Sequence, residues 1–141
     1  MTDQARNGTV VGVIGLGNAG YAVASAFGKL SPVHGYDLNG DKRTSASQGG
    51  IITHDQFDAF MAAIDVAILS LPHPDISLAV TGQLLDLESR PKLIIDTSTV
   101  TPQTAIDCAS LTSPYGVGFV DAAIAGGVAS MANGRMTFFM G

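Results

Sequence analysis

Apolar positions along the chain follow two different periods, and their alternation predicts an α/β fold. Short runs of β-branched and aliphatic residues, typical of strands, recur between segments with an apolar residue every three or four positions, typical of helices. Strands are predicted at residues 9–14, 33–37, 51–52, 65–71, 92–96, 117–121 and 136–140. Helices are predicted at residues 18–30, 42–48, 57–64, 75–89 and 102–112, with a further short helical stretch after Gly127.

The order of these elements predicts a Rossmann-type, doubly wound and mostly parallel sheet with right-handed crossovers. Residues 65–71 are almost continuously apolar, as a parallel strand covered on both faces requires. Residues 9–141 are predicted to form one domain and residues 1–8 a frayed tail. Asp41 is expected to cap the helix at 42–48. In such sheets ligands bind outside the carboxyl ends of the strands, so those ends are where chemistry is expected.

The first predicted strand leads directly into a G-x-G-x-x-G motif and then into a helix. The motif consists of Gly15, Leu16, Gly17, Asn18, Ala19 and Gly20. Gly15 allows a tight turn, Gly17 allows the backbone to approach a phosphate, and Gly20 allows the helix to pack close to the strand. The start of the helix offers free N–H groups to an anion. This combination predicts a site for the pyrophosphate of a dinucleotide.

The second predicted strand ends in Asp37, 22 residues after Gly15, with Leu38 next to it. A carboxylate at this spacing is expected to accept hydrogen bonds from the adenosine ribose; the alternative is that Asp37 only caps a turn. A carboxylate repels a 2′-phosphate, so NAD is favoured over NADP. Lys42 and Arg43 could bind that phosphate, which keeps NADP open.

Four segments are predicted to converge at one edge of the sheet: the glycine motif, Asp37, residues 71–73 and residues 97–99. His73 is interpreted as a loop histidine beside the cofactor phosphates rather than a proton shuttle, because no carboxylate partner is evident. His34 and His54 are interpreted as structural, and the scattered histidines predict no metal site. Cys108 is interpreted as a small buried apolar residue rather than a nucleophile.

Composition narrows the class of protein. The net charge is −5, which argues against a nucleic-acid partner. No apolar run approaches the roughly 18 residues of a membrane span, no signal peptide is evident, and one cysteine suits a reducing compartment, so a cytoplasmic location is expected. Charged residues make up 13% of the chain, about half the usual fraction. This suggests an extensively buried sheet or a surface that covers another domain.

Four motifs in the same order, at residues 15–20, 71–74, 96–102 and 121–127, resemble the cofactor domain of the β-hydroxyacid dehydrogenases. This family includes 3-hydroxyisobutyrate dehydrogenase and tartronate semialdehyde reductase and is related to 6-phosphogluconate dehydrogenase. The resemblance implies that Leu71 and Pro72 lie along the dinucleotide and that Thr97 and Ser98 lie near the nicotinamide ribose. It also implies that a small carboxylate substrate is held by the backbone N–H groups of the segment Ala125, Gly126 and Gly127.

The chain departs from the family pattern in two ways. Ala125 stands where the family has a serine, and Ala123 where it has a proline, so the substrate cannot be carried over from the family. The resemblance implies an all-helical second domain with the lysine that donates and accepts the proton; because the sequence ends at Gly141, we interpret it as the family's cofactor domain, cut out or truncated. No catalytic residue is therefore expected in this chain, and little or no turnover by the chain alone.

The leading hypothesis is the cofactor domain of an NAD(P)-dependent oxidoreductase that acts on a small β-hydroxyacid or its semialdehyde. Two alternatives stay open: a non-catalytic NAD(H) sensor, and a fragment of an imine reductase-like enzyme. A homo-oligomer is also open.

Overall fold

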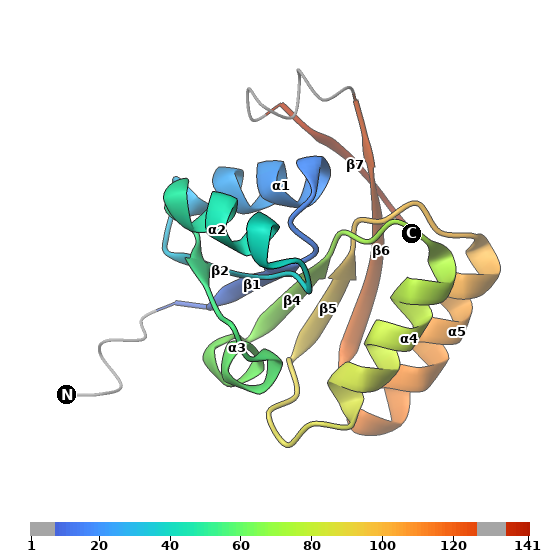
Figure 1. Ribbon diagram of the computed structural model, residues 1–141. Coiled ribbons are helices and arrows are strands. Elements are labelled where there is room, and N and C mark those ends of the chain that lie inside the picture. The colour runs from blue at the N-terminus through green and yellow to red at the C-terminus, as the bar shows by residue number, and fades with distance from the viewer. Residues whose placement is uncertain (1–7, 127–134) are drawn as a thin grey trace.

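The chain folds into a sheet with helices on both faces (Figure 1). The computed structural model describes residues 8–126 and 135–141. Nearly all of the predicted tail at 1–8, and the helical stretch predicted after Gly127, lie outside the described residues. The strands are β1 (Val11–Ile14), β2 (Val33–Tyr36), β3 (Ile52–Thr53), β4 (Val66–Leu69), β5 (Leu93–Asp96), β6 (Gly118–Ala125) and β7 (Thr137–Met140). The helices are α1 (Asn18–Gly28), α2 (Gly40–Gln48), α3 (Phe57–Ala63), α4 (Pro74–Leu85) and α5 (Pro102–Thr112), followed by the short 3-10 helix η2 (Ser113–Tyr115).

The strands form one sheet in the order β3-β2-β1-β4-β5-β6-β7. β1 lies between β2 and β4 and is parallel to both, and β7 runs antiparallel to β6. The chain therefore winds away from β1 in both directions, which is the doubly wound, mostly parallel arrangement predicted from the sequence. The point between β1 and β4, where the winding reverses, is where ligands of such folds bind.

Alternate residues of the central strands supply two apolar cores, one on each face of the sheet. Val13 and Ile68 pack with Val23 of α1, whereas Ile14 and Leu69 pack with residues of α3 and α4. Figure 1 shows α1 and α2 on one face and α4 and α5 beside each other on the opposite face. Both faces of the central strands are covered, which explains their continuous apolar sequence.

Three predicted boundaries are wrong by several residues. α1 ends at Gly28 rather than at Leu30, whose side chain is 84% exposed. α4 ends at Leu85 rather than at residue 89. β6 continues to Ala125 rather than ending at residue 121, because its last four residues pair with β7. Propensity sets strand length less strongly than the presence of a neighbouring strand does.

The capping residue of α2 also differs from the prediction. Asn39, not Asp41, is the N-cap, and its side-chain oxygen accepts hydrogen bonds from the N–H groups of Asp41 and Lys42. Asp41 lies in the first turn instead, where its negative charge interacts favourably with the positive end of the helix dipole.

α4 buries two polar residues against the core in addition to its apolar residues Leu84 and Leu85. Ser77 and Thr81 are fully buried, and the Thr81 hydroxyl donates to the Ser77 carbonyl. Ile76, an apolar residue of the same helix, is 41% exposed. Ile76 and Val80 border a cavity, whereas Leu84 and Leu85 of the same helix are buried in the core. In the described part of the chain, no helix is both long and apolar enough to cross a membrane.

Candidate functional site

A cavity of about 600 Å³ lies at the carboxyl ends of β1, β2 and β4. Its volume is within the usual range for sites that hold small molecules and cofactors. Of the predicted site residues, it is lined by Gly15, Gly17, Asn18, Ala19, Gly20, Asp37, Leu38, Leu71 and Pro72. Three separate segments of the chain therefore meet here, as the strand order requires.

The glycine turn has the geometry that each glycine predicts. Gly15 has a φ of +96°, and a Cβ there would overlap the Ser70 carbonyl oxygen. A Cβ at Gly20 would overlap the Gly15 carbonyl oxygen, so Gly20 allows α1 to approach the turn. A Cβ at Gly17 would have nothing within 4 Å. Gly15 and Gly20 are thus required by the fold itself, whereas Gly17 borders open space.

The N-terminus of α1 offers unpaired N–H groups beside this space. Gly17 is the N-cap, no side chain hydrogen-bonds to the first turn, and no acidic residue lies in that turn. The positive end of the helix dipole is therefore not compensated by an acidic residue within the first turn of α1 itself. Since Gly17, Asn18 and Ala19 all line the cavity, this helix end can bind a negatively charged group such as a phosphate.

Asp37 lies between the glycine turn and the turn after β2. Its Oδ2 accepts a hydrogen bond from the Leu16 N–H at 2.8 Å, and its Oδ1 accepts one from the Asn39 N–H at 2.8 Å. A carboxylate has about four acceptor positions, so both oxygens retain capacity for a ligand's hydroxyl groups. The structure therefore gives Asp37 the turn-capping role and also places it on the cavity. Leu16, by contrast, has a buried side chain and does not line the cavity.

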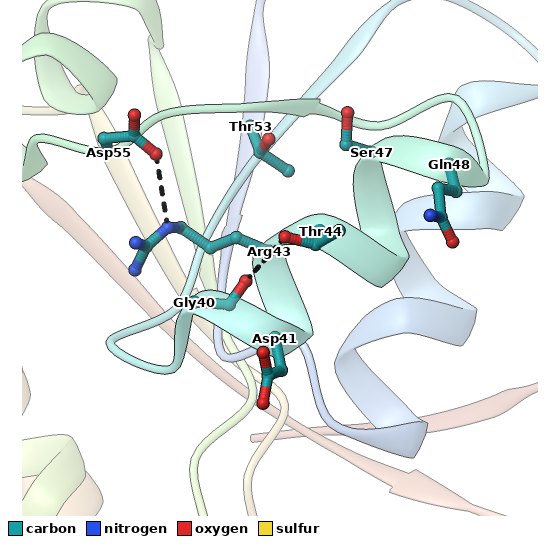
Figure 2. Close-up of a pocket in the computed structure, with 8 residues that line it drawn as sticks. All are labelled: Gly40, Asp41, Arg43, Thr44, Ser47, Gln48, Thr53 and Asp55. Atoms are coloured by element: carbon teal, nitrogen blue, oxygen red, sulfur yellow. Dashed lines mark hydrogen bonds and ion pairs between the residues drawn. The ribbon is translucent and has the colours of Figure 1, made fainter.

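The consecutive cations of α2 face different surroundings. Lys42 lines the cavity at the glycine turn. Arg43 instead lines a smaller polar cavity of about 420 Å³ between α2 and the segment after β3 (Figure 2). Its Nη1 donates to the carbonyl oxygens of Asp37 at 2.7 Å and Leu38 at 3.2 Å. Lys42 therefore lines the main cavity, and Arg43 bonds to the backbone of the turn after β2.

The pair Thr97 and Ser98 is buried beside the main cavity rather than lining it. The Thr97 hydroxyl donates to the Leu69 carbonyl at 2.7 Å, and the Ser98 hydroxyl accepts from the Leu71 N–H at 2.8 Å. Both hydroxyls hold the segment after β4, which carries Leu71 and Pro72 into the cavity. Their contact with a nicotinamide ribose stays a prediction.

His73 has a carboxylate neighbour that the sequence interpretation missed. It is the N-cap of α4, and its Nδ1 accepts from the Asp75 N–H at 3.3 Å and lies 3.7 Å from Asp75 Oδ2. The side chains of both residues are exposed, and His73 does not line the cavity. The expectation that it has no acidic partner was therefore wrong, and its place beside the cofactor phosphates stays a prediction.

The predicted substrate segment lies only partly within the described residues. Ala125 is the last residue of β6, Gly126 follows with a φ of +122°, and Gly127 lies outside the described residues. The positive φ of Gly126 is a conformation that a residue with a side chain rarely adopts. Glycine at this position therefore has a backbone reason, independent of any substrate.

Further cavity residues were not predicted from the sequence as part of a site. They are Ile14, Tyr36, Phe57, Ser70, Ile76, Val80 and Gln83. Ser70 and Tyr36 could have been found, because each lies at the carboxyl end of a strand next to β1. Ile76 and Val80 could not, because their helical spacing resembles that of core residues. These side chains give the cavity an apolar wall on α4.

A buried polar cluster lies beside the site, between β5, β6 and α4. Asp96 is fully buried, and its Oδ1 accepts from the Ser98 N–H at 2.9 Å, whereas Oδ2 has no hydrogen-bond partner within the described residues. Burial raises the pKa of Asp96, and the charge of Asp121, its partner in strand register, acts in the same direction. Burial also raises the pKa of the Cys108 thiol, which is fully enclosed. Cys108 is thus confirmed as a buried residue.

The other two histidines bond to each other at the edge of the sheet. His34 Nδ1 and His54 Nε2 are 2.8 Å apart, and the ring planes differ by 19°. Burial, followed by the neighbouring His54, lowers the pKa of His34. The pair links β2 to the segment after β3, which agrees with the structural interpretation.

Comparison with known proteins identifies the family to which the chain is related. The family profile described as the NAD binding domain of 6-phosphogluconate dehydrogenase matches residues 10–141. Mitochondrial 3-hydroxyisobutyrate dehydrogenase of Rattus norvegicus is 30% identical over 94% of this chain and 41% of its own length. The 2-(hydroxymethyl)glutarate dehydrogenase of Eubacterium barkeri is 27% identical over 93% of this chain and 45% of its own length.

Among solved structures, 3-hydroxyisobutyrate dehydrogenase of Mycobacterium tuberculosis with L-serine superposes with a TM-score of 0.85. It is 28% identical in sequence, and the match covers 94% of this chain and 46% of that one. The chain spans less than half the length of the curated relatives it matches. The shared part corresponds to the fold described above.

Proposed function

Because the chain belongs to the family of the NAD binding domain of 6-phosphogluconate dehydrogenase, we propose that it is the NAD(H)-holding part of an oxidoreductase. The reaction is oxidation of a small β-hydroxyacid or reduction of its semialdehyde. The nicotinamide, when bound, supplies the hydride chemistry, and the residues of this chain bind and orient it. The proton donor and acceptor is expected to be the family's lysine, located beyond Gly141.

The observation that carries this proposal is the open space at Gly17. The turn has two glycines that the fold requires and a third whose missing side chain leaves room beside an uncapped helix end. A purely structural βα turn has no need for that third glycine. A pyrophosphate placed there would accept hydrogen bonds from the backbone N–H groups of the first turn of α1.

Asp37 supports NAD over NADP as the cofactor. Its carboxylate lies on the cavity wall and would repel a 2′-phosphate, while it can accept hydrogen bonds from the two ribose hydroxyls. Arg43, the cation most suited to a phosphate, already donates to two carbonyl oxygens behind the turn. Lys42 is the remaining cation on this cavity, which leaves weaker binding of NADP as the expectation.

Titration with NADH and with NADPH tests the proposal, with the fluorescence of the cofactor as the signal. NADH is expected to bind saturably and more tightly than NADPH. The substitution Asp37→Asn removes the charge but keeps the shape of the side chain. It should raise the dissociation constant for NADH about tenfold, the effect of about one hydrogen bond to a charged group. The same substitution should weaken the binding of NADPH less, because the repulsion between the carboxylate and the 2′-phosphate also disappears.

Glu88→Gln is the matched control, since it removes an acidic charge from a residue that does not line the cavity. Absence of saturable binding of either cofactor would contradict the proposal. If Asp37→Asn weakens the binding of NADH and NADPH equally, Asp37 does not contact the adenosine ribose.

A further inference from the structure

Arg43 is a partly buried arginine whose hydrogen bonds all go to one turn. Its side chain is 21% exposed, and Nη1 donates to the carbonyl oxygens of Asp37 and Leu38 at 2.7 and 3.2 Å. Asp37 and Leu38 both line the dinucleotide cavity, whereas Arg43 does not. The guanidinium therefore bonds to a turn that lines the cavity without lining the cavity itself.

The second partner of Arg43 is weaker. Figure 2 shows its Nε directed toward Asp55, with Oδ1 at 3.6 Å, which is an ion-pair distance too long for a hydrogen bond. The Asp55 side chain is 90% exposed, and an exposed ion pair contributes little to stability because water screens it. The bonds to the two carbonyl oxygens are therefore the ones that fix Arg43 and the turn relative to each other.

The same turn is held from its other side through the Asp37 side chain. The Leu16 and Asn39 N–H groups each donate to one carboxylate oxygen of Asp37. The backbone of Asp37 is thus bound by a cation and its side chain by two amides. Loss of the cation would free the backbone and change the direction in which the carboxylate faces the cavity.

We propose that Arg43 is a positioning residue for cofactor selection: it holds the Asp37–Leu38 turn so that the Asp37 carboxylate meets the adenosine ribose. This inference rests on the proposed NAD(H) site. Arg43 itself touches no part of the cofactor. The assignment differs from that of a phosphate ligand, which would be expected to point into the cavity, as Lys42 does.

The test compares Arg43→Met, which keeps the apolar stem, with Arg43→Lys, which keeps the charge and one donor group. Dissociation constants for NADH and NADPH are measured for each variant by cofactor fluorescence. Arg43→Met should weaken NADH by about tenfold, the effect of losing a hydrogen bond from a charged donor. The binding of NADPH should weaken less, so that the ratio of the two dissociation constants moves closer to one. Arg43→Lys should recover part of the lost affinity for NADH.

Arg90→Met is the matched control. Arg90 also donates to a backbone carbonyl, that of Leu85 at 2.7 Å, and its guanidinium lies over the Tyr115 ring, but it does not line the cavity. This variant should leave both dissociation constants unchanged. An effect equal to that of Arg43→Met would mean that general loosening of the fold, not positioning, is responsible, and would overturn the inference.

A double-mutant cycle with Asp37→Asn provides the readout that a merely structural role would not move. If Arg43 acts through Asp37, adding Arg43→Met to Asp37→Asn should raise the dissociation constant for NADH by less than about threefold. The reason is that the carboxylate to be positioned has already been replaced. Additive losses would overturn the inference, and so would a loss confined to NADPH. If the unaltered chain binds neither cofactor, the proposed function fails first; if it binds NADH and only Arg43→Met is without effect, the positioning role alone fails.

Discussion

Gly17 and Gly20 belong to one motif but are expected to respond to substitution in opposite ways. Gly17→Val places a side chain in a region with nothing within 4 Å, at a φ of −69° that any residue can adopt. Replacing a glycine where the conformation is compatible stabilises by about 0.4–1 kcal/mol through the unfolded state. A poorer N-cap offsets a similar amount. The free energy of unfolding should therefore change by less than about 1 kcal/mol.

Cofactor binding should respond much more strongly to Gly17→Val. The new side chain would occupy the space through which a pyrophosphate reaches the N–H groups of α1. Each hydrogen bond lost to a charged group is worth about 1.5–3 kcal/mol. Loss of two such bonds should raise the dissociation constant for NADH more than about a hundredfold, since about 1.4 kcal/mol corresponds to a tenfold change in a dissociation constant.

Gly20→Ala should show the reverse order of effects, with stability lost first. Its Cβ would overlap the Gly15 carbonyl oxygen, which is backbone and cannot rotate away. The helix or the turn must shift, at a cost of about 1–3 kcal/mol. Urea denaturation followed by circular dichroism measures stability, and NADH fluorescence measures binding. If Gly17→Val unfolds the chain, or if it binds NADH like the unaltered chain, the assignment of Gly17 to the pyrophosphate is wrong.

Three further predictions concern titration and packing. Burial raises the pKa of Asp96, so the folded state holds its proton more tightly, and the free energy of unfolding should fall as the pH rises above about 4; Asp96→Asn should flatten this decline in urea titrations over a pH series. Burial lowers the pKa of His34, so stability should fall as the pH drops below about 6.5, and NMR titration of His34 should show protonation below its usual range. Thr97→Val removes the hydroxyl that donates to the Leu69 carbonyl, which keeps its bond from the Thr97 N–H, and should lower the free energy of unfolding in urea by about 0.5–1.5 kcal/mol; an unchanged midpoint would show that this hydroxyl bond does not stabilise the fold.

The sequence was sufficient to predict the strand–helix alternation and the glycine turn because both depend on local chemistry. The apolar runs at β4 and β5 are long enough to require cover on both faces, and glycine at position 15 has a positive φ that few other residues adopt. The position of Asp37 followed from the fixed length of a β-α-β unit. These features needed no knowledge of which strand is the neighbour of which.

Features that depend on a distant partner could not be predicted in this way. The last residues of β6 are strand only because β7 pairs with them. Ile76 and Val80 have the spacing of core residues but line the cavity, whereas the polar residues Ser77 and Thr81 of the same helix are buried. The different surroundings of Lys42 and Arg43 also depend on the segment after β3, which supplies Asp55. Sequence spacing shows which residues share a helix face but not what that face meets.

The packing of Gly15 against Ser70 has a consequence for when the binding site forms during synthesis. The motif at residues 15–20 is contiguous, but its turn is completed by the Ser70 N–H, which donates to the Ile14 carbonyl, and by the close approach of the Ser70 carbonyl to Gly15. A nascent chain that has emerged only as far as β2 therefore has the motif without the turn's supporting wall. Competence to recognise an anion should arise only after β4 inserts beside β1, so a fragment ending before residue 66 would carry the fingerprint and lack the site.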